Sequence, residues 1–292
     1  MRPDNTLNVM APLAQREEIP GDDAVLALAQ ERLFEAGLGA EFYLESPAHL
    51  QTLLRYRPGC APCTAHLSRS LNLLSEEDRA LIAEYARVAA GHLTGLVVHD
   101  LAGFRRDPAA TQAALAAMDR ALQEIPGTPR LFVENSGQLS FAETEALAQA
   151  VLPLRNLGIC LDIAHLAIQS CRVRFSALEI GTDIRPLLAE PGLLAERMPE
   201  IQRVVEEARV EALALIGRVA KRGQPIHFHV HDGHPLSTLS RYGVSDHLSF
   251  LQPIRLPLAW QGRRLVSGCY GVDGLRQFAE TVARAAPLER CS

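Results

Sequence analysis

Short apolar segments alternate with longer amphipathic segments along almost the whole chain. Eight of the short segments are typical of strands, and they lie at 8–12, 41–44, 63–67, 96–99, 131–134, 159–162, 226–231 and 264–266. The longer segments have helical periodicity, and they lie at 24–36, 47–55, 75–90, 108–125, 140–154, 201–222 and 272–286. Strands that alternate with helices predict parallel β-α units, and eight such units predict a (β/α)8 TIM barrel.

No linker, repeat or low-complexity segment divides the chain, so we expect a single TIM-barrel domain over residues 1–292. A barrel of this kind often needs about 250 residues. The segment 166–199 is long and mixed, which predicts an active-site loop with one or two short helices. The chain has no G-x-G-x-x-G or Walker pattern, and this argues against a doubly wound nucleotide-binding fold.

The predicted strand from Ile226 is unusual because it carries three histidines at alternate positions. Side chains alternate between the two faces of a strand, so His227, His229 and His231 share one face and Phe228 the other. Three imidazoles followed by Asp232 make a good metal site, since a carboxylate often orients a histidine ligand. The alternative is a polar strand face that contacts solvent.

Polar residues recur at the carboxyl ends of five separate predicted strands. These residues are His66, His99, Glu134, Asp162 and His229. In a TIM barrel such ends converge on the face that holds the active site. Each residue taken alone has an ordinary structural explanation, either a hydrogen-bonded core histidine or a helix-capping carboxylate. Taken together, histidine and carboxylate suit Zn²⁺, Mn²⁺ or Fe and disfavour a purely oxygen-ligated Ca²⁺ site.

The composition is that of a soluble globular protein, with 48% apolar and 22% charged residues. The net charge of −5 gives no overall attraction for nucleic acid or an anionic membrane, although it does not exclude a locally basic cleft. No apolar run reaches the length of about 18 residues that a transmembrane helix needs. The amino terminus lacks the pattern of a signal peptide, so the cytoplasm is the expected compartment.

Cys60 and Cys63 form a single C-x-x-C. A structural zinc site would need a second pair of ligands, and a redox motif would need a thioredoxin-like context. The sequence offers neither, so we expect an ordinary loop whose thiols are reduced, bind no metal and lie away from the site.

At the strand-end residues the sequence resembles the xylose isomerase-like TIM-barrel superfamily. This superfamily includes sugar isomerases and epimerases and the endonuclease IV-type AP endonucleases. The resemblance runs from about the third strand to the seventh. It is carried by Thr64-Ala65-His66-Leu67, Leu71-Asn72-Leu73, Val98-His99, Val133-Glu134-Asn135-Ser136-Gly137, Cys160-Leu161-Asp162-Ile163-Ala164-His165 and His229-Val230-His231-Asp232.

The resemblance implies one or more divalent ions, Zn²⁺ or Mn²⁺, held at the mouth of the barrel. The implied ligands are His66, His99, Glu134, Asp162, His165, His229 and His247. Glu134, Asp162 and His229 would be ligands in both branches, whereas His66 and His99 resemble extra ligands of the endonuclease branch. His165 would be a ligand in that branch and a substrate-binding residue in the sugar branch.

The candidate catalytic residues are Glu134, His165 and His231. The resemblance implies the roles of Glu134 and His165, whereas His231 follows from the strand alternation, because it lies one pleat beyond His229 and is therefore suited to contact the substrate. Ser245-Asp246-His247 resembles the Asp-x-His ligand segment of the endonuclease branch, but here the Asp is adjacent to the His, so His247 is the better candidate.

One departure from the superfamily affects the expected chemistry. Both branches place a Glu at the end of the eighth strand, where this chain reads Leu265-Val266-Ser267-Gly268-Cys269-Tyr270-Gly271. The two-Glu proton transfer of the sugar isomerases loses a partner, and the trinuclear cluster of the nucleases loses a bridge. Glu45, at the end of the second strand, is one candidate substitute.

Three functions fit these observations. The first is a metal-dependent isomerase or epimerase that acts on a small carbohydrate or hydroxy-carbonyl substrate. The second is a metallohydrolase of phosphodiesters, for which Arg105, Arg106, Arg172 and Arg174 would face an anionic substrate, or else form a solvated rim. The absence of a Lys/Arg run or an aromatic wedge weakens a DNA role. The third is a metal-binding barrel without catalysis. We favour the small-molecule enzyme.

Overall fold

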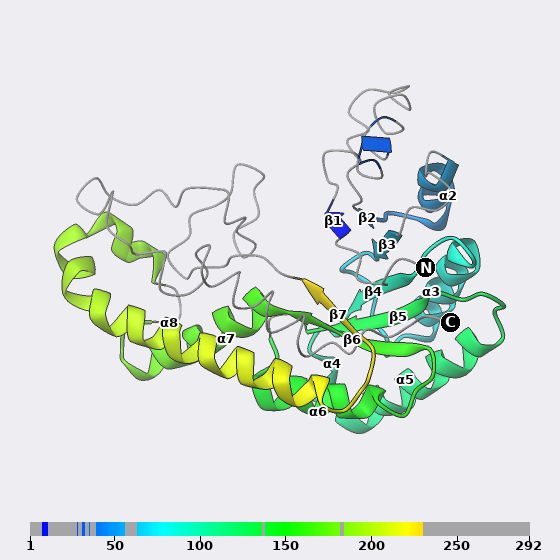
Figure 1. The fold of residues 1–292 in the computed structure, drawn as a ribbon. Helices are drawn as coiled ribbons and strands as arrows, with labels where there is room; N and C mark the ends of the chain where they lie inside the picture. Colours follow the sequence, from blue (N-terminus) through cyan, green and yellow to red (C-terminus); the bar gives the residue numbers. More distant parts are fainter. Residues whose placement is uncertain are drawn as a thin grey trace. The chain divides into compact units, whose positions relative to one another are not determined.

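The computed structural model describes residues 39–55, 63–135, 138–181 and 184–229, the strand at 8–10, and the helical positions 28, 31, 32 and 35. Within these residues the fold is α/β, with one sheet of strand order β1-β2-β3-β4-β5-β6-β7 (Figure 1). The five pairings from β1–β2 to β5–β6 are all parallel. Parallel strands in chain order are what a TIM-like fold requires.

The bounds of the strands and of the helices at 47–55, 76–89, 108–123 and 141–151 agree with the hydrophobic pattern to within a few residues. The strands are β1 Asn8–Met10, β2 Gly39–Tyr43, β3 Cys63–His66, β4 Gly95–His99, β5 Arg130–Glu134, β6 Leu157–Asp162 and β7 Ile226–His229. The helices are α2 Pro47–Arg55, α3 Glu76–Ala89, α4 Gly103–Arg106, α5 Pro108–Gln123, α6 Phe141–Val151, α7 Ile163–Ala177, η1 Arg185–Ala189 and α8 Pro191–Ala220. The expected eighth strand at 264–266 and last helix at 272–286 lie outside the described residues.

Two predicted helix starts are confirmed by their capping bonds. The Ser75 side chain accepts a hydrogen bond from the backbone N–H of Asp78 at the start of α3. At the start of α6, the Ser140 N–H donates to Glu143 at 2.7 Å and the Glu143 N–H donates back to Ser140 Oγ at 3.3 Å. This reciprocal pair is the capping box expected from the sequence.

The segment 166–199 differs from the prediction of a mixed loop. Its first part is α7, which begins at Ile163, and its last part belongs to the 30-residue helix α8, which passes through Pro199. Proline removes one helical hydrogen bond. The helix continues because Leu194, Met198, Ile201 and residues at the same spacing beyond them are buried along one stripe.

The chain forms two compact units, which are described separately. The first comprises residues 1–134, 149–160 and 288–292, and the second comprises 135–148 and 161–287. Two of the boundaries fall inside elements, one in α6 and one in β6. Domain boundaries normally fall in exposed linkers. The division therefore leaves the prediction of a single domain untested.

In the first unit, the strands have one apolar face and one polar face. Phe42, Ala65, Leu96, Val98, Leu131 and Val133 alternate with the polar positions and are fully buried. The register places Glu41 and Tyr43 of β2 beside Thr64 and His66 of β3 on the opposite face. The same alternation assigns His99 and Glu134, which are paired residues of β4 and β5, to this polar face.

Gly95 lies on the polar face of β4 by the same alternation, and a larger side chain there would meet an aromatic ring. A Cβ at this position would lie 2.8 Å from Cε2 of Phe132 on the neighbouring strand. Phe132 thus occupies the space above Gly95. The ring lies two residues before Glu134 on the same side of β5.

In the second unit, α7 packs against α8 through a buried apolar seam and a charged rim. Phe175 is fully buried, and Arg174 forms ion pairs with Glu207 and Glu211 of α8. Burial raises the pKa of the nearby Cys171 thiol to about 12, with Arg174 opposing the shift and Glu211 adding to it. The Cys171 thiol is therefore not a nucleophile near neutral pH.

Glu145 joins α6 to the end of α8 through Arg218 and Arg222. Burial acts to raise the pKa of Glu145, but hydrogen bonds and charge from the two arginines outweigh it and hold the pKa below its ordinary value of 4.5. A carboxyl with a depressed folded pKa contributes stability above its unfolded pKa and loses that contribution as the pH falls through the folded pKa.

We therefore expect Glu145→Gln to destabilise the protein at pH 6 to 7 by roughly 0.5–1 kcal/mol, since the group is partly exposed. The difference from the wild type should shrink as the pH falls below about 4.5, the unfolded pKa. Thermal unfolding of both proteins between pH 7 and pH 3 checks this, and a difference that grows on acidification would contradict it.

None of the helices in the described part of the chain combines the length and the apolar character that a membrane span needs.

Candidate metal centre

Three of the predicted site residues end consecutive strands of the first unit. His66 is the last residue of β3, His99 of β4 and Glu134 of β5. We call them the β3–β5 cluster. All three are buried, and Glu134 is only 1% exposed. The parallel register brings the three strand ends together, so the strand-end pattern seen in the sequence has a structural counterpart here.

The histidines of the β3–β5 cluster face one carboxylate oxygen. His66 Nε2 lies 2.8 Å from Glu134 Oε2, and His99 Nε2 lies 3.5 Å from the same atom. The two imidazole rings are 4.7 Å apart. Tyr43 of the neighbouring strand β2 stacks on His66 with ring centroids 5.1 Å apart, which fixes the plane of the imidazole.

The hydrogen bonds of His66 define the arrangement of its protons. Nδ1 lies 2.9 Å from the Leu67 carbonyl oxygen, which can only accept, so Nδ1 donates. The 2.8 Å contact between Nε2 and Glu134 then needs either a second proton between the two atoms or a cation near both. A histidine whose Nδ1–H is held by a backbone carbonyl presents Nε2 as a metal ligand.

Three further predicted residues gather in the second unit, and we call them the β6–β7 cluster. Asp162 ends β6, His165 lies in the first turn of α7, and His229 ends β7. Oδ2 of Asp162 lies 3.5 Å from His165 Nδ1 and 4.0 Å from His229 Nδ1. All three residues are buried.

Asp162 has a structural role in addition to its place in this cluster. Its Oδ1 accepts a 2.8 Å hydrogen bond from the His165 backbone N–H and so caps α7. The helix-capping explanation for this residue is therefore correct for Oδ1. Because Oδ1 is held by the cap, the carboxylate plane is fixed and Oδ2 is directed toward the two imidazoles.

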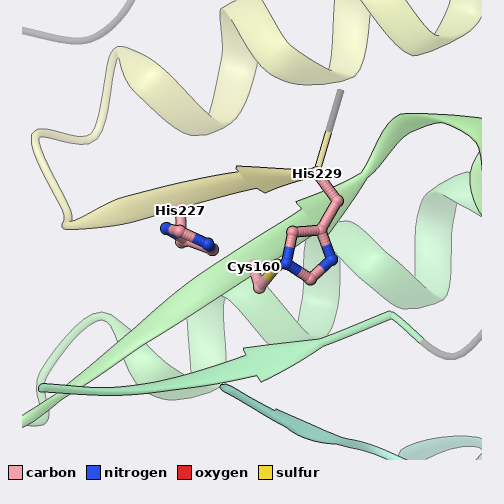
Figure 2. A group of neighbouring side chains, drawn as sticks. All are labelled: Cys160, His227 and His229. Carbon is pink, nitrogen blue, oxygen red and sulfur yellow. The ribbon is translucent and has the colours of Figure 1, made fainter. Parts of the chain in front are cut away.

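His227 and His229 extend from the same strand, as predicted from the alternation on β7 (Figure 2). Their ring centroids are 5.2 Å apart and the rings are nearly perpendicular. His229 is buried, whereas His227 is half-buried. The same figure labels Cys160, a buried residue of β6.

Buried His, Glu, Asp and Cys side chains of the described residues could hold a metal ion. Each cluster supplies two imidazoles and one carboxylate, a donor set that catalytic zinc sites use. Ligand atoms around a tetrahedral Zn²⁺ lie about 3.4 Å apart, as bond lengths of about 2.1 Å require. The Nε2–Oε2 distances of 2.8 and 3.5 Å in the β3–β5 cluster bracket this value. The two imidazole–carboxylate pairs of this cluster are therefore spaced as ligands of a divalent ion would be.

Sequence reasoning missed a buried carboxylate on the polar face. Glu41 is 2% exposed, and its Oε2 accepts a 2.7 Å hydrogen bond from Thr64 Oγ1. The alternation within β2 puts Glu41 and Tyr43 on one face, and this was the available signal. Glu45, the candidate substitute for the missing carboxylate, is exposed after the end of β2.

Other predicted residues lie outside the described part of the chain. These are His231, Asp232, Asp246 and His247. Their predicted roles in substrate and metal binding remain predictions.

The arginines considered for an anionic substrate have different environments. Arg174 is neutralised by Glu207 and Glu211 on α8. Arg105 and Arg106 of α4 and Arg172 of α7 are exposed. Arg174 is therefore part of the helix interface in the second unit rather than a phosphate-binding residue.

Cys63 is buried on β3, while Cys60 lies outside the described residues. We expect the double variant Cys60→Ser, Cys63→Ser to retain its metal content, because the pair should bind no metal. Elemental analysis of the wild type and the double variant, purified without chelator, checks this. Loss of a stoichiometric Zn²⁺ from the variant would contradict it.

No protein-family model matches this chain, and no curated protein matches it either.

Proposed function

We propose that the protein is a metal-dependent isomerase or epimerase that acts on a small carbohydrate or hydroxy-carbonyl substrate. The proposal includes a closed (β/α)8 barrel of the xylose isomerase-like superfamily. It rests on the sequence motifs together with the parallel strands in chain order, whose ends carry the histidines and carboxylates.

The observation that carries the proposal is the buried contact between His66 and Glu134. A carboxylate oxygen 2.8 Å from an imidazole nitrogen, both nearly fully buried, forms a pair that can hold or release a proton. Isomerases and epimerases move a proton at a carbon next to a carbonyl, and positioned acid–base groups of this kind carry out that step.

The residues of the two clusters have different roles in this proposal. His66, His99 and Glu134 in one cluster, and Asp162, His165 and His229 in the other, would hold divalent ions. When bound, such an ion polarises a carbonyl or binds vicinal hydroxyls of the substrate. Glu134 accepts or returns the proton, and His66 stabilises the charge on Glu134. Tyr43, stacked on His66, keeps the imidazole in place.

The charges favour a small substrate without phosphodiester groups. The net charge is −5, and Arg174 is neutralised by two carboxylates. A nuclease needs cationic contacts to the phosphate backbone. A metallohydrolase of phosphodiesters is the second candidate, because His99 adds another imidazole 3.5 Å from Glu134 Oε2, as the endonuclease branch implies.

A single comparison separates the two candidates. The metal-loaded protein is incubated in D₂O with a panel of ketoses, aldoses and hydroxy-carbonyl acids, and in parallel with bis(p-nitrophenyl) phosphate. Deuterium at the carbon next to the carbonyl, detected by NMR, supports the isomerase. Release of p-nitrophenol without deuterium exchange supports the hydrolase. If protein that holds stoichiometric metal gives neither signal, the result supports a metal-binding barrel without catalysis.

A further inference from the structure

Asn135 follows Glu134 directly, at the point where the pairing between β5 and β6 ends. Its side chain is completely buried. The Asn135 Oδ1 accepts from the Asp162 backbone N–H at 2.8 Å, and its Nδ2 donates to the Asp162 carbonyl oxygen at 3.1 Å. One amide side chain thus pairs with both backbone groups of a single residue, much as a neighbouring strand would.

The backbone of Asn135 makes a third contact, with His165. The Asn135 carbonyl oxygen lies 3.3 Å from His165 Nδ1. A carbonyl can only accept, so Nδ1 carries the proton and Nε2 carries the lone pair that binds a metal. His165 is tied in turn to Asp162 through its backbone N–H, at 2.8 Å from Oδ1. Asn135, Asp162 and His165 therefore form a closed set of hydrogen bonds.

We propose that Asn135 is a positioning residue that orients Asp162 and His165 as metal ligands in the β6–β7 cluster. This inference rests on the proposed metal-dependent function. The Asn135 side chain fixes the backbone on which the Asp162 carboxylate stands, and the Asn135 carbonyl fixes the ring tautomer of His165. Polar partners behind the ligands tune metal affinity in this way.

The chemistry of the side chain explains why an Asn is needed here. Asp would keep an acceptor for the Asp162 N–H, but it would lack the donor for the Asp162 carbonyl and would add a negative charge. Ala would remove both bonds. Gln is one methylene longer and would push against a strand end that is already closely packed, since Asn135 and Asp162 are both fully buried.

The test is Co²⁺ titration of the metal-free full-length protein, followed by calorimetry and by the visible absorption of bound Co²⁺. Asn135→Ala should weaken Co²⁺ binding by roughly 10- to 100-fold, the range for residues that orient ligands. It should also change the absorption bands, because the ligand geometry changes. Asn135→Asp should give a similar band shift with a smaller loss of affinity.

Asn156→Ala is the matched control. Asn156 precedes β6 at its other end, and its side-chain Nδ2 donates to the Asp119 carbonyl oxygen at 3.5 Å, a bond that Ala would remove. This variant should lower the melting temperature without changing the Co²⁺ affinity or spectrum. If Asn135 had a purely structural role, Asn135→Ala would likewise lower the melting temperature of the protein, and the Co²⁺ absorption spectrum would be unchanged.

The outcomes are distinct. If the wild type binds Co²⁺ and both Asn135 variants bind it with unchanged affinity and bands, the inference about Asn135 is wrong while the metal centre stands. If the wild type binds no Co²⁺, Zn²⁺ or Mn²⁺, the proposed function and this inference are both wrong. If Asn135→Ala does not fold, Asn135→Asp tests the inference in its place. Shifted Co²⁺ absorption bands in that variant support the inference, and unchanged bands contradict it.

Discussion

Replacing Glu134 with Gln is expected to weaken binding of a divalent ion by at least about 100-fold, because residues that merely orient ligands already contribute about 10- to 100-fold. Glu134 Oε2 faces both His66 Nε2 and His99 Nε2. Gln has the same shape but no charge. Its amide can donate to His66 Nε2, so the metal-free variant should fold and unfold near the temperature of the metal-free wild type.

Metal titration of the purified variant measures this effect, and the turnover of any substrate found should fall by about 10²- to 10⁴-fold because an acid–base group is lost. Glu145→Gln is the matched control, since it removes a carboxylate held by Arg218 and Arg222 on the helical side of the second unit. The control should bind metal like the wild type. Equal metal affinity in Glu134→Gln would place the centre elsewhere.

His229→Ala is expected to remove metal from the β6–β7 cluster, again with a loss of affinity of at least about 100-fold. His229 is the buried histidine of β7, and its Nδ1 lies 4.0 Å from Asp162 Oδ2. Two ligand atoms of this set would remain, which is too few for a stable zinc site. Titration with Co²⁺ or Zn²⁺ measures the loss, and thermal unfolding checks that the variant is folded.

His227→Ala is the companion variant, because it removes the other described histidine of β7 that could supply a metal ligand. His227 is half-buried and lies next to His229, with ring centroids 5.2 Å apart. Its removal should leave metal affinity within a few-fold of the wild type. Loss of metal in His227→Ala but not in His229→Ala would show that the ligand on β7 has been assigned wrongly.

The sequence predicted most of the described fold because its signals were local. The helix at 47–55 has the predicted bounds, and the strands at His66, His99 and Glu134 end where polar residues interrupt apolar runs. The segment 166–199 was misjudged for two physical reasons. Asp162 ends a strand and caps α7 at once, so no loop separates them. Packing of α8 against α7 also outweighs the helix-breaking effect of Pro199.

Only those residues of the candidate site that lie at strand ends could be predicted from the sequence. Residues at the ends of parallel strands stand out in a sequence, and this identified Glu134, Asp162 and His229 as candidates. Glu41 was missed because it lies inside a strand, where only the two-residue alternation marks its face. The role of Asn135 could not be read from the sequence, since it depends on bonds to residues 27 and 30 positions away.

Elemental analysis of protein purified without chelator tests the central claim most directly, when the wild type is compared with the double variant Glu134→Gln, His229→Ala. We predict at least one divalent ion per chain in the wild type, and a folded double variant from which it is lost. Full metal occupancy in the double variant, or a wild type that holds no divalent ion even after incubation with Zn²⁺ or Mn²⁺, would contradict the proposed centre and the function that depends on it.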